Sequence, residues 1–144
     1  MAKAVVIDSD AIFAIYNPND PLNKEATRTF QQLIVEDFQF IYPTSVIFEV
    51  VSLFQRVLPN QAVTTKIIEM IKNDQMSIFV VDEAILKQAA LIFDPAGSKK
   101  NTLIDCSVAV IAKEIKAQAV FAYDDFYSKQ GLKLARELFQ TVRG

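Results

Sequence analysis

The sequence contains no histidine and no tryptophan, and it has a single cysteine, Cys106. Without histidine, the Ser-His-Asp triads, the usual zinc sites and imidazole acid–base chemistry are excluded. One cysteine cannot form an internal disulfide, and the apolar residues around Cys106 predict a buried, inert thiol. If the protein is an enzyme, carboxylates must carry its chemistry.

Glycine, proline and long apolar runs are also scarce. The chain of 144 residues has 3 glycines and 5 prolines, so its loops must be short. No apolar run approaches the roughly 20 residues of a membrane span. We therefore expect one domain over residues 1–144, no membrane insertion and a place in the reducing cytoplasm. Because the net charge is −2, any nucleic-acid binding must depend on a local basic patch.

Apolar residues make up 51% of the chain and fall into two periodicities. Short apolar runs bounded by polar residues are typical of parallel strands buried on both faces. Stretches with an apolar side repeating every three to four residues predict helices. Strands alternating with helices indicate an α/β fold, a three-layer α/β/α sandwich around a mostly parallel sheet. The predicted strands are 4–8, 38–42, 77–81 and 119–123, and the predicted helices are 10–16, 22–36, 44–57, 61–72, 83–93 and 102–116.

Several helix starts have recognisable caps, whereas the tail is ambiguous. Thr44, Asp82 and Thr102 stand where the helices from 44, 83 and 102 begin, and each is a favoured capping residue. From Ser128 onward the apolar spacing fits a strand or a helix equally well.

Four acids lie at the predicted ends of strands or on helices: Asp8, Glu49, Asp105 and Asp124. In open α/β sheets, ligands bind outside the carboxyl ends of the strands, so these acids can converge on one site. Clustered carboxylates repel one another unless a cation or a shared proton neutralises them. A hard divalent ion such as Mg²⁺ or Mn²⁺ prefers carboxylate oxygens and would be the simplest occupant.

Each acid also has an ordinary structural explanation. Asp8 can cap the helix that follows it. Thr102 and Asp105 fit a capping box, in which the acid accepts from the backbone N–H of the cap. Asp124 can be a turn residue. Glu49 falls on a polar stripe of its helix with Ser45, Ser52 and Arg56, and that stripe either faces solvent or forms the wall of a small polar cleft.

Four segments in order, "VVIDSD", "FEV", "TLIDCSVAVIAKE" and "VFAYDDFYSKQGLKL", resemble the PIN-domain ribonucleases over essentially the whole chain. The resemblance implies that Asp8, Glu49, Asp105 and Asp124 are the catalytic and metal-binding acids. It also implies that Gly131 to Leu134 form a closing strand.

The chain departs from the family pattern at a few positions. Ala122 replaces a common Ser or Thr, and Asp10 stands where Asn or another small polar residue is commoner. Asp125 adjoins Asp124, so the fourth acid is not unique. Tyr127 occupies the place of an aromatic residue that is often Phe, and this spacing favours Asp124.

The resemblance further implies hydrolysis of RNA phosphodiester bonds with Mg²⁺ or Mn²⁺, and a role as the toxin of a type II toxin–antitoxin pair, held by a small antitoxin. A homodimer is expected, because Phe48, Phe54 and Phe139 exceed what a small core can use. The hydroxyl of Ser9 and a few basic residues are candidates for holding RNA. The basic candidates are Arg56, Lys99, Lys100 and Lys129.

Two other functions remain open from the residues alone. Asp8-Ser9-Asp10, Asp124-Asp125 and Lys99 or Lys100 resemble the motifs of haloacid-dehalogenase-like phosphatases, in which Asp8 would be the nucleophile. That interpretation lacks the Gly-Thr expected after Asp10 and leaves Glu49 and Asp105 without a role. The other alternative is a non-catalytic interaction domain that keeps the fold.

Overall fold

A four-stranded parallel sheet forms the centre of the protein. The structure, a computed structural model, describes residues 3–140. The strands are β1 (Ala4–Ile7), β2 (Gln39–Pro43), β3 (Ser77–Phe79) and β4 (Ala119–Phe121), in the order β3-β2-β1-β4. All three pairings are parallel, with Val6 opposite Ile41 on one side and Val120 on the other. The carboxyl ends of the strands therefore lie at one edge of the sheet.

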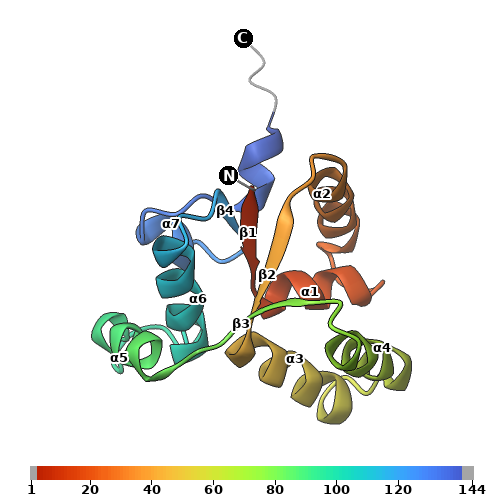
Figure 1. Cartoon of the computed structure of the whole chain (residues 1–144), viewed down its shortest axis with the longest axis horizontal. Helices are drawn as coiled ribbons and strands as arrows, with labels where there is room; N and C mark the ends of the chain where they lie inside the picture. The colour runs from red at the N-terminus through yellow and green to blue at the C-terminus, as the bar shows by residue number, and fades with distance from the viewer. Residues whose placement is uncertain (1–2, 141–144) are drawn as a thin grey trace.

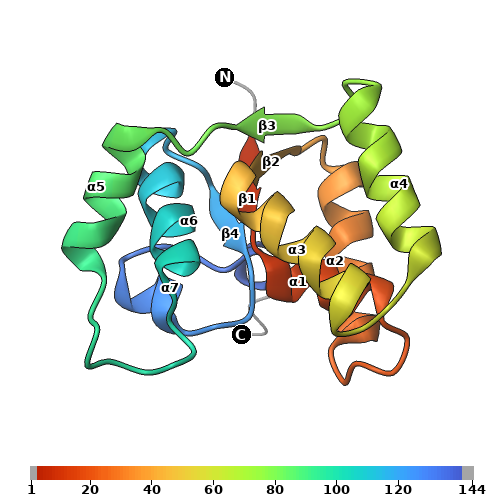
Figure 2. The same cartoon turned by 90° about the horizontal axis from the view of Figure 1, so that it is seen from below.

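Helices cover both faces of this sheet, which confirms the three-layer α/β/α sandwich. In Figure 1, α5 and α6 lie on one side of the strands, and α1, α2 and α4 lie on the other. Figure 2 shows the same two groups from below, with α3 in front of the strands. The helices are α1 (Ser9–Tyr16), α2 (Asn23–Val35), α3 (Thr44–Arg56), α4 (Gln61–Lys72), α5 (Glu83–Ile92), α6 (Leu103–Glu114), α7 (Phe126–Lys129) and a 3-10 helix η1 (Ala135–Phe139).

Burial explains why β1 and α6 have such apolar sequences. Val5 and Val6 of β1 are fully buried, because strands and helices surround them on every side. Every residue of α6 from Cys106 to Ala112 is buried as well. Cys106 is 1% exposed and burial raises the pKa of its thiol, so the predicted inert thiol agrees with the structure. These two elements fix the positions of Asp8 and Asp105, which stand at the end of β1 and in the first turn of α6.

Most predicted elements are present, and their ends differ by a few residues. Asp82 and Thr102 cap α5 and α6 as predicted, through bonds from the N–H groups of Ile85 and Asp105. The prediction that Thr44 caps α3 is wrong. Pro43 occupies the cap position, and the Thr44 hydroxyl instead accepts a hydrogen bond from the Val81 N–H at 3.0 Å.

The tail contains little strand. The predicted closing strand from Gly131 to Leu134 is reduced to one bridge between Leu134 and Val120, followed by η1. Gly131 has φ +79°, a turn conformation that non-glycine residues rarely adopt, and it reverses the chain after α7. Leu134 and Ala135 are buried, so the tail still packs onto β4.

Among the helices of residues 3–140, none has both the length and the apolar character that crossing a membrane requires.

Candidate active site

Asp8 stands directly after β1 and is almost completely buried. Its backbone N–H donates to the Phe121 carbonyl of β4 at 3.0 Å, which continues the pairing of the two strands by one residue. Its side chain caps α1, because Oδ1 accepts the Ser9 N–H at 2.7 Å. The other oxygen, Oδ2, accepts the Tyr127 hydroxyl at 2.5 Å. Asp8 is therefore a helix cap with one oxygen and an acid of the site with the other.

Asp105 has the same double role in the first turn of α6. The capping box is complete, because Asp105 Oδ2 accepts the Thr102 N–H at 2.9 Å and the Thr102 hydroxyl accepts the Asp105 N–H at 3.3 Å. Its free oxygen, Oδ1, lies 3.4 Å from the Tyr127 hydroxyl, the same group that donates to Asp8. The capping explanation is therefore confirmed for Asp105, and its role in a metal site stays a prediction.

Asp124 follows β4 and is held by two donors. Its Oδ1 accepts the Phe126 N–H at 2.8 Å and lies 3.4 Å from the Asn101 side-chain amide. Asp125, the alternative fourth acid, is exposed and its Oδ2 lies 3.7 Å from the Lys129 ammonium. The structure thus places Asp124 toward the acids and Asp125 toward solvent.

One pocket brings all four predicted acids together, although they come from separate elements. Glu49 reaches it from α3, so this part of the polar stripe does line a cleft, while Ser52 and Arg56 on the same helix are exposed. The pocket has a volume of about 230 Å³, room for a hydrated ion and a phosphate group, since a water molecule takes roughly 30 Å³. Its lining residues are Asp8, Ser9, Asp10, Phe13, Glu49, Leu53, Lys100, Thr102, Asp105 and Asp124.

Asp10 is a fifth acid in this pocket, and the resemblance gave it no role. Its Oδ2 accepts the Tyr123 N–H at 2.9 Å, which ties α1 to the segment that carries Asp124. Its Oδ1 is buried and has no hydrogen-bond partner. Burial raises the pKa of Asp10 to about 6, and the charges of Asp105 and Asp124 add to this rise. The hydrogen bond from the Tyr123 N–H acts in the opposite direction and lowers the pKa.

The pKa values of Asp8 and Asp105 are raised as well. Burial raises the pKa of Asp8 well above its usual range, and the neighbouring charges of Asp10 and Asp105 add to the shift. Burial also raises the pKa of Asp105, although the hydrogen bond from the Thr102 N–H lowers it. The protein's own donors therefore do not fully neutralise the negative charge in this pocket.

A divalent cation fits this chemistry. The donors are carboxylate oxygens, which Mg²⁺ and Mn²⁺ prefer, and the buried Oδ1 of Asp10 lacks any partner of its own. Within residues 3–140, no group of three or more such acids is arranged to hold a metal ion. Binding of an ion by three acids would thus require at least one further acid side chain to turn toward a pair such as Asp8 and Asp105.

The predicted RNA-binding residues divide into two groups. Lys100 lines the acid pocket and also an adjoining polar pocket, which Lys129 and Asn101 share with Asp124. Lys99 and Arg56 are exposed and line neither of these two pockets. Ser9 lines the acid pocket, but it is 9% exposed and its hydroxyl lies 3.4 Å from Asp8 Oδ1, so its nearest partner is that acid.

Sequence reasoning missed the groups that hold the acids in place. The Tyr127 hydroxyl and the Asn101 amide contact acids that lie 22 to 119 residues away in the chain. The position of Tyr127 was noted only for its aromatic ring. The replacement of a common Phe by Tyr was the one local signal for the hydroxyl.

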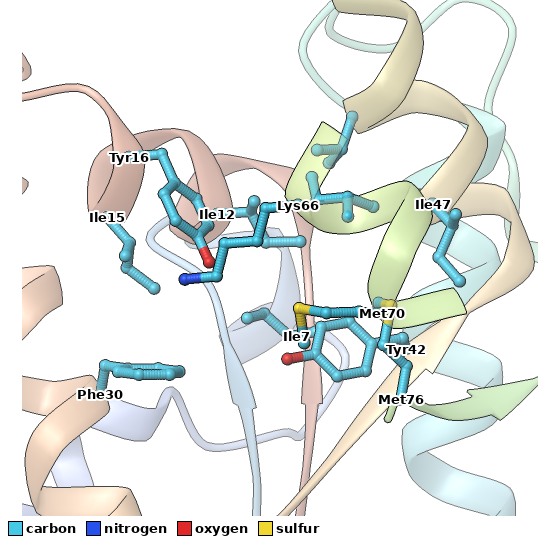
Figure 3. A pocket seen from close by; sticks show the side chains of 12 residues that line it. Ile7, Ile12, Ile15, Tyr16, Phe30, Tyr42, Ile47, Lys66, Met70 and Met76 are labelled. Atoms are coloured by element: carbon cyan, nitrogen blue, oxygen red, sulfur yellow. The ribbon is translucent and has the colours of Figure 1, made fainter. Parts of the chain in front are cut away.

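Another cavity lies away from the acids. Figure 3 shows this apolar cavity, lined by residues of α1, α2, α3 and α4 together with Ile7 and Tyr42 from the sheet. Its one charged lining residue is Lys66, whose ammonium lies 5.4 Å from the centre of the Tyr16 ring. Without a carboxylate, this cavity cannot supply the acid chemistry of the other pocket.

Comparisons with known proteins agree with this fold. The sequence model of the PIN domain matches residues 5–131. Among solved structures, the chain is similar to Mycobacterium tuberculosis VapC20, described as a toxin that cleaves the sarcin–ricin loop. The TM-score is 0.71 at 15% sequence identity, over 89% of this chain and 95% of that one. No curated protein sequence matches the chain. Since the PIN-domain match covers most of its length, the chain belongs to the PIN-domain family.

Proposed function

We propose that this protein is a Mg²⁺- or Mn²⁺-dependent endoribonuclease that hydrolyses RNA phosphodiester bonds. The observation that carries the proposal is the meeting of Asp8, Glu49, Asp105 and Asp124 in one pocket with Lys100 at its wall, in a chain of the PIN-domain family. The phosphatase alternative left Glu49 and Asp105 without a role, and both line this pocket.

In this proposal each acid has a defined task. Asp8, Asp105 and Asp124, at the carboxyl edge of the sheet, and Glu49, from α3, would together hold the cation. When bound, the ion would lower the pKa of a water molecule and neutralise charge that builds up on the phosphate. The chain's own residues orient the substrate, and no histidine is needed.

Lys100 and Lys129 would hold the RNA backbone beside the acids. Lys100 lines both pockets, so it is shared by the acids and the adjoining polar surface. The ion pair of Lys129 with Asp125 is exposed on both sides, and such pairs contribute little, so a phosphate can replace the carboxylate. Contacts with phosphates do not depend on the RNA sequence, and their contribution to RNA affinity should fall as the salt concentration rises.

The biological role that we propose is the toxin of a toxin–antitoxin pair in the cytoplasm. The support is the structural similarity to a toxin of the same fold and the family resemblance. A small antitoxin protein would then bind the chain and block cleavage. Co-expression with the product of a small neighbouring reading frame tests this role, because an antitoxin should co-purify with the chain and abolish its activity.

We also propose that the single domain forms a homodimer. Of the three phenylalanines that suggested this from the sequence, only Phe48 still supports it. Phe54 is 2% exposed and stacks on Phe13, with ring centres 4.9 Å apart, and Phe139 packs against Phe38. Neither is surplus to the core. Phe48 on α3 is 75% exposed and lines an apolar hollow with Ile78 of the edge strand β3, so this is the surface that a second copy would cover.

The experiment that tests the nuclease is cleavage of mixed RNA by protein freed of metal with EDTA. Cleavage should return with Mg²⁺ or Mn²⁺ and stay absent in EDTA. Asp124→Asn protein purified in the same way controls for contaminating nucleases and should be inactive. Asp125→Asn should retain cleavage, because that carboxylate faces solvent. Cleavage that survives EDTA in the pure protein would contradict the metal mechanism.

A further inference from the structure

The Tyr127 hydroxyl lies between two acids of the site. Tyr127 belongs to α7 and is fully buried. Its hydroxyl donates to Asp8 Oδ2 at 2.5 Å and lies 3.4 Å from Asp105 Oδ1. Asp8 comes from the end of β1 and Asp105 from the start of α6, so one hydroxyl from a third element joins them.

Each of the two acids already has one oxygen fixed locally. The Ser9 N–H holds Asp8 Oδ1 at 2.7 Å, and the Thr102 N–H holds Asp105 Oδ2 at 2.9 Å. The second oxygen of each acid faces Tyr127. Within residues 3–140, no other side chain comes within hydrogen-bond distance of both acids. The backbone therefore sets where each acid stands, while the hydroxyl determines how the two are turned relative to one another.

A donor at this place opposes a repulsion. Asp8 is almost completely buried and Asp105 is partly buried, and neighbouring carboxylates repel one another unless a positive or donor group lies between them. A hydroxyl that donates to a carboxylate forms a charge-assisted bond, which is shorter and stronger than a neutral one. It also occupies only one lone pair of Oδ2, so the second lone pair of that oxygen stays free.

We propose that Tyr127 is a positioning residue, whose hydroxyl holds Asp8 and Asp105 as a prearranged pair for the divalent cation. The inference rests on the proposed function, because it assumes that these acids bind the ion. A phenylalanine at 127 would fill the same buried space without the donor, so the hydroxyl, and not the ring, carries this role.

The test compares Tyr127→Phe with the wild-type chain. Mn²⁺ binding by titration calorimetry is the main readout, together with cleavage rates over a range of Mn²⁺ concentrations. Loss of an outer hydrogen-bond partner of a ligand typically costs about 10- to 100-fold in metal affinity or activity. We expect at least about 10-fold weaker Mn²⁺ binding, with most of the cleavage rate recovered at saturating Mn²⁺.

Tyr42→Phe is the matched control. Tyr42 is a partly buried tyrosine of β2, and its hydroxyl lies in the apolar cavity of Figure 3, away from the acids. Its removal should leave Mn²⁺ affinity unchanged. Circular dichroism of both variants in EDTA checks that each is folded.

The outcomes separate this inference from the proposed function. Wild-type protein that binds no Mn²⁺ would overturn both. Wild-type binding with unchanged affinity in Tyr127→Phe would overturn the positioning role alone. If Tyr127→Phe does not fold, proton NMR of the wild-type chain decides. We expect a low-field hydroxyl resonance that shifts on addition of Mg²⁺, and a resonance unaffected by Mg²⁺ would refute the inference.

Discussion

Asp10→Asn should make the metal-free protein more stable at neutral and alkaline pH. Asp10 Oδ2 accepts the Tyr123 N–H, while Oδ1 is buried without a partner beside the other acids. Asparagine has nearly the same shape and keeps an acceptor for the Tyr123 N–H. It also removes one negative charge from the crowded pocket.

The size of this effect follows from the pKa of Asp10, which burial raises from 3.8 to about 6. At 1.36 kcal/mol per pKa unit, the ionised carboxylate destabilises the folded state by about 3 kcal/mol. The amide accepts a weaker hydrogen bond than the carboxylate does, which offsets about 1 kcal/mol. We expect a net gain of about 2 kcal/mol, or roughly 4 to 8 °C in melting temperature for a domain of this size.

The direction of the pH dependence is fixed by the raised pKa. Well below its unfolded pKa of 3.8, Asp10 is protonated in the folded and the unfolded chain, so the aspartate carries no penalty. Between about pH 4 and 6 the unfolded chain is mostly ionised while the folded chain is not, and the stability of the wild-type protein falls as pH rises. The advantage of Asp10→Asn should therefore be complete at pH 8 and mostly lost at pH 4.

Urea unfolding in EDTA at pH 8 and at pH 4 measures both quantities. A lower stability of Asp10→Asn at pH 8 would show that the carboxylate is needed for the bond to Tyr123, and would refute this reasoning. An equal gain at both pH values would exclude the charge as its cause. Cleavage should survive the change, whereas a phosphatase that used Asp10 as general acid would lose about 10²- to 10⁴-fold.

Two further predictions concern the other acids and the assembly. Asp105→Asn should end cleavage and weaken Mn²⁺ binding without lowering the melting temperature in EDTA, because its amide oxygen can still accept the Thr102 N–H. Asp105→Ala loses the side-chain acceptor for the Thr102 N–H and should be less stable than Asp105→Asn by about 1 kcal/mol. Equal melting of the two variants would contradict this assignment. Light scattering at micromolar concentration should give a dimer for the wild-type chain and a monomer for Phe48→Glu, and a wild-type monomer would exclude the proposed interface.

The sequence predicted the layers of the fold because their signals are local. The buried strands β1 and β4 and the helix α6 are apolar enough to be recognised alone, and the caps Asp82 and Thr102 act within three residues. The failure at Thr44 has the opposite cause. Its hydroxyl bonds to Val81, 37 residues away, and no local pattern shows that the chain passes there. The predicted closing strand in the tail is wrong for the same reason, because packing on β4, and not the local periodicity, sets the conformation of the tail.

The site shows why alternatives for a single acid need not compete. The sequence offered helix capping or metal binding for Asp8 and for Asp105, and each explanation uses only one carboxylate oxygen. In the fold, one oxygen of each acid accepts a backbone N–H at the start of α1 or α6, and the other contacts the Tyr127 hydroxyl. Helix N-termini carry partial positive charge, so this placement partly stabilises the acids before any cation arrives. Replacing the carboxylate by an amide separates the two roles, because capping needs an acceptor while the metal site needs the charge.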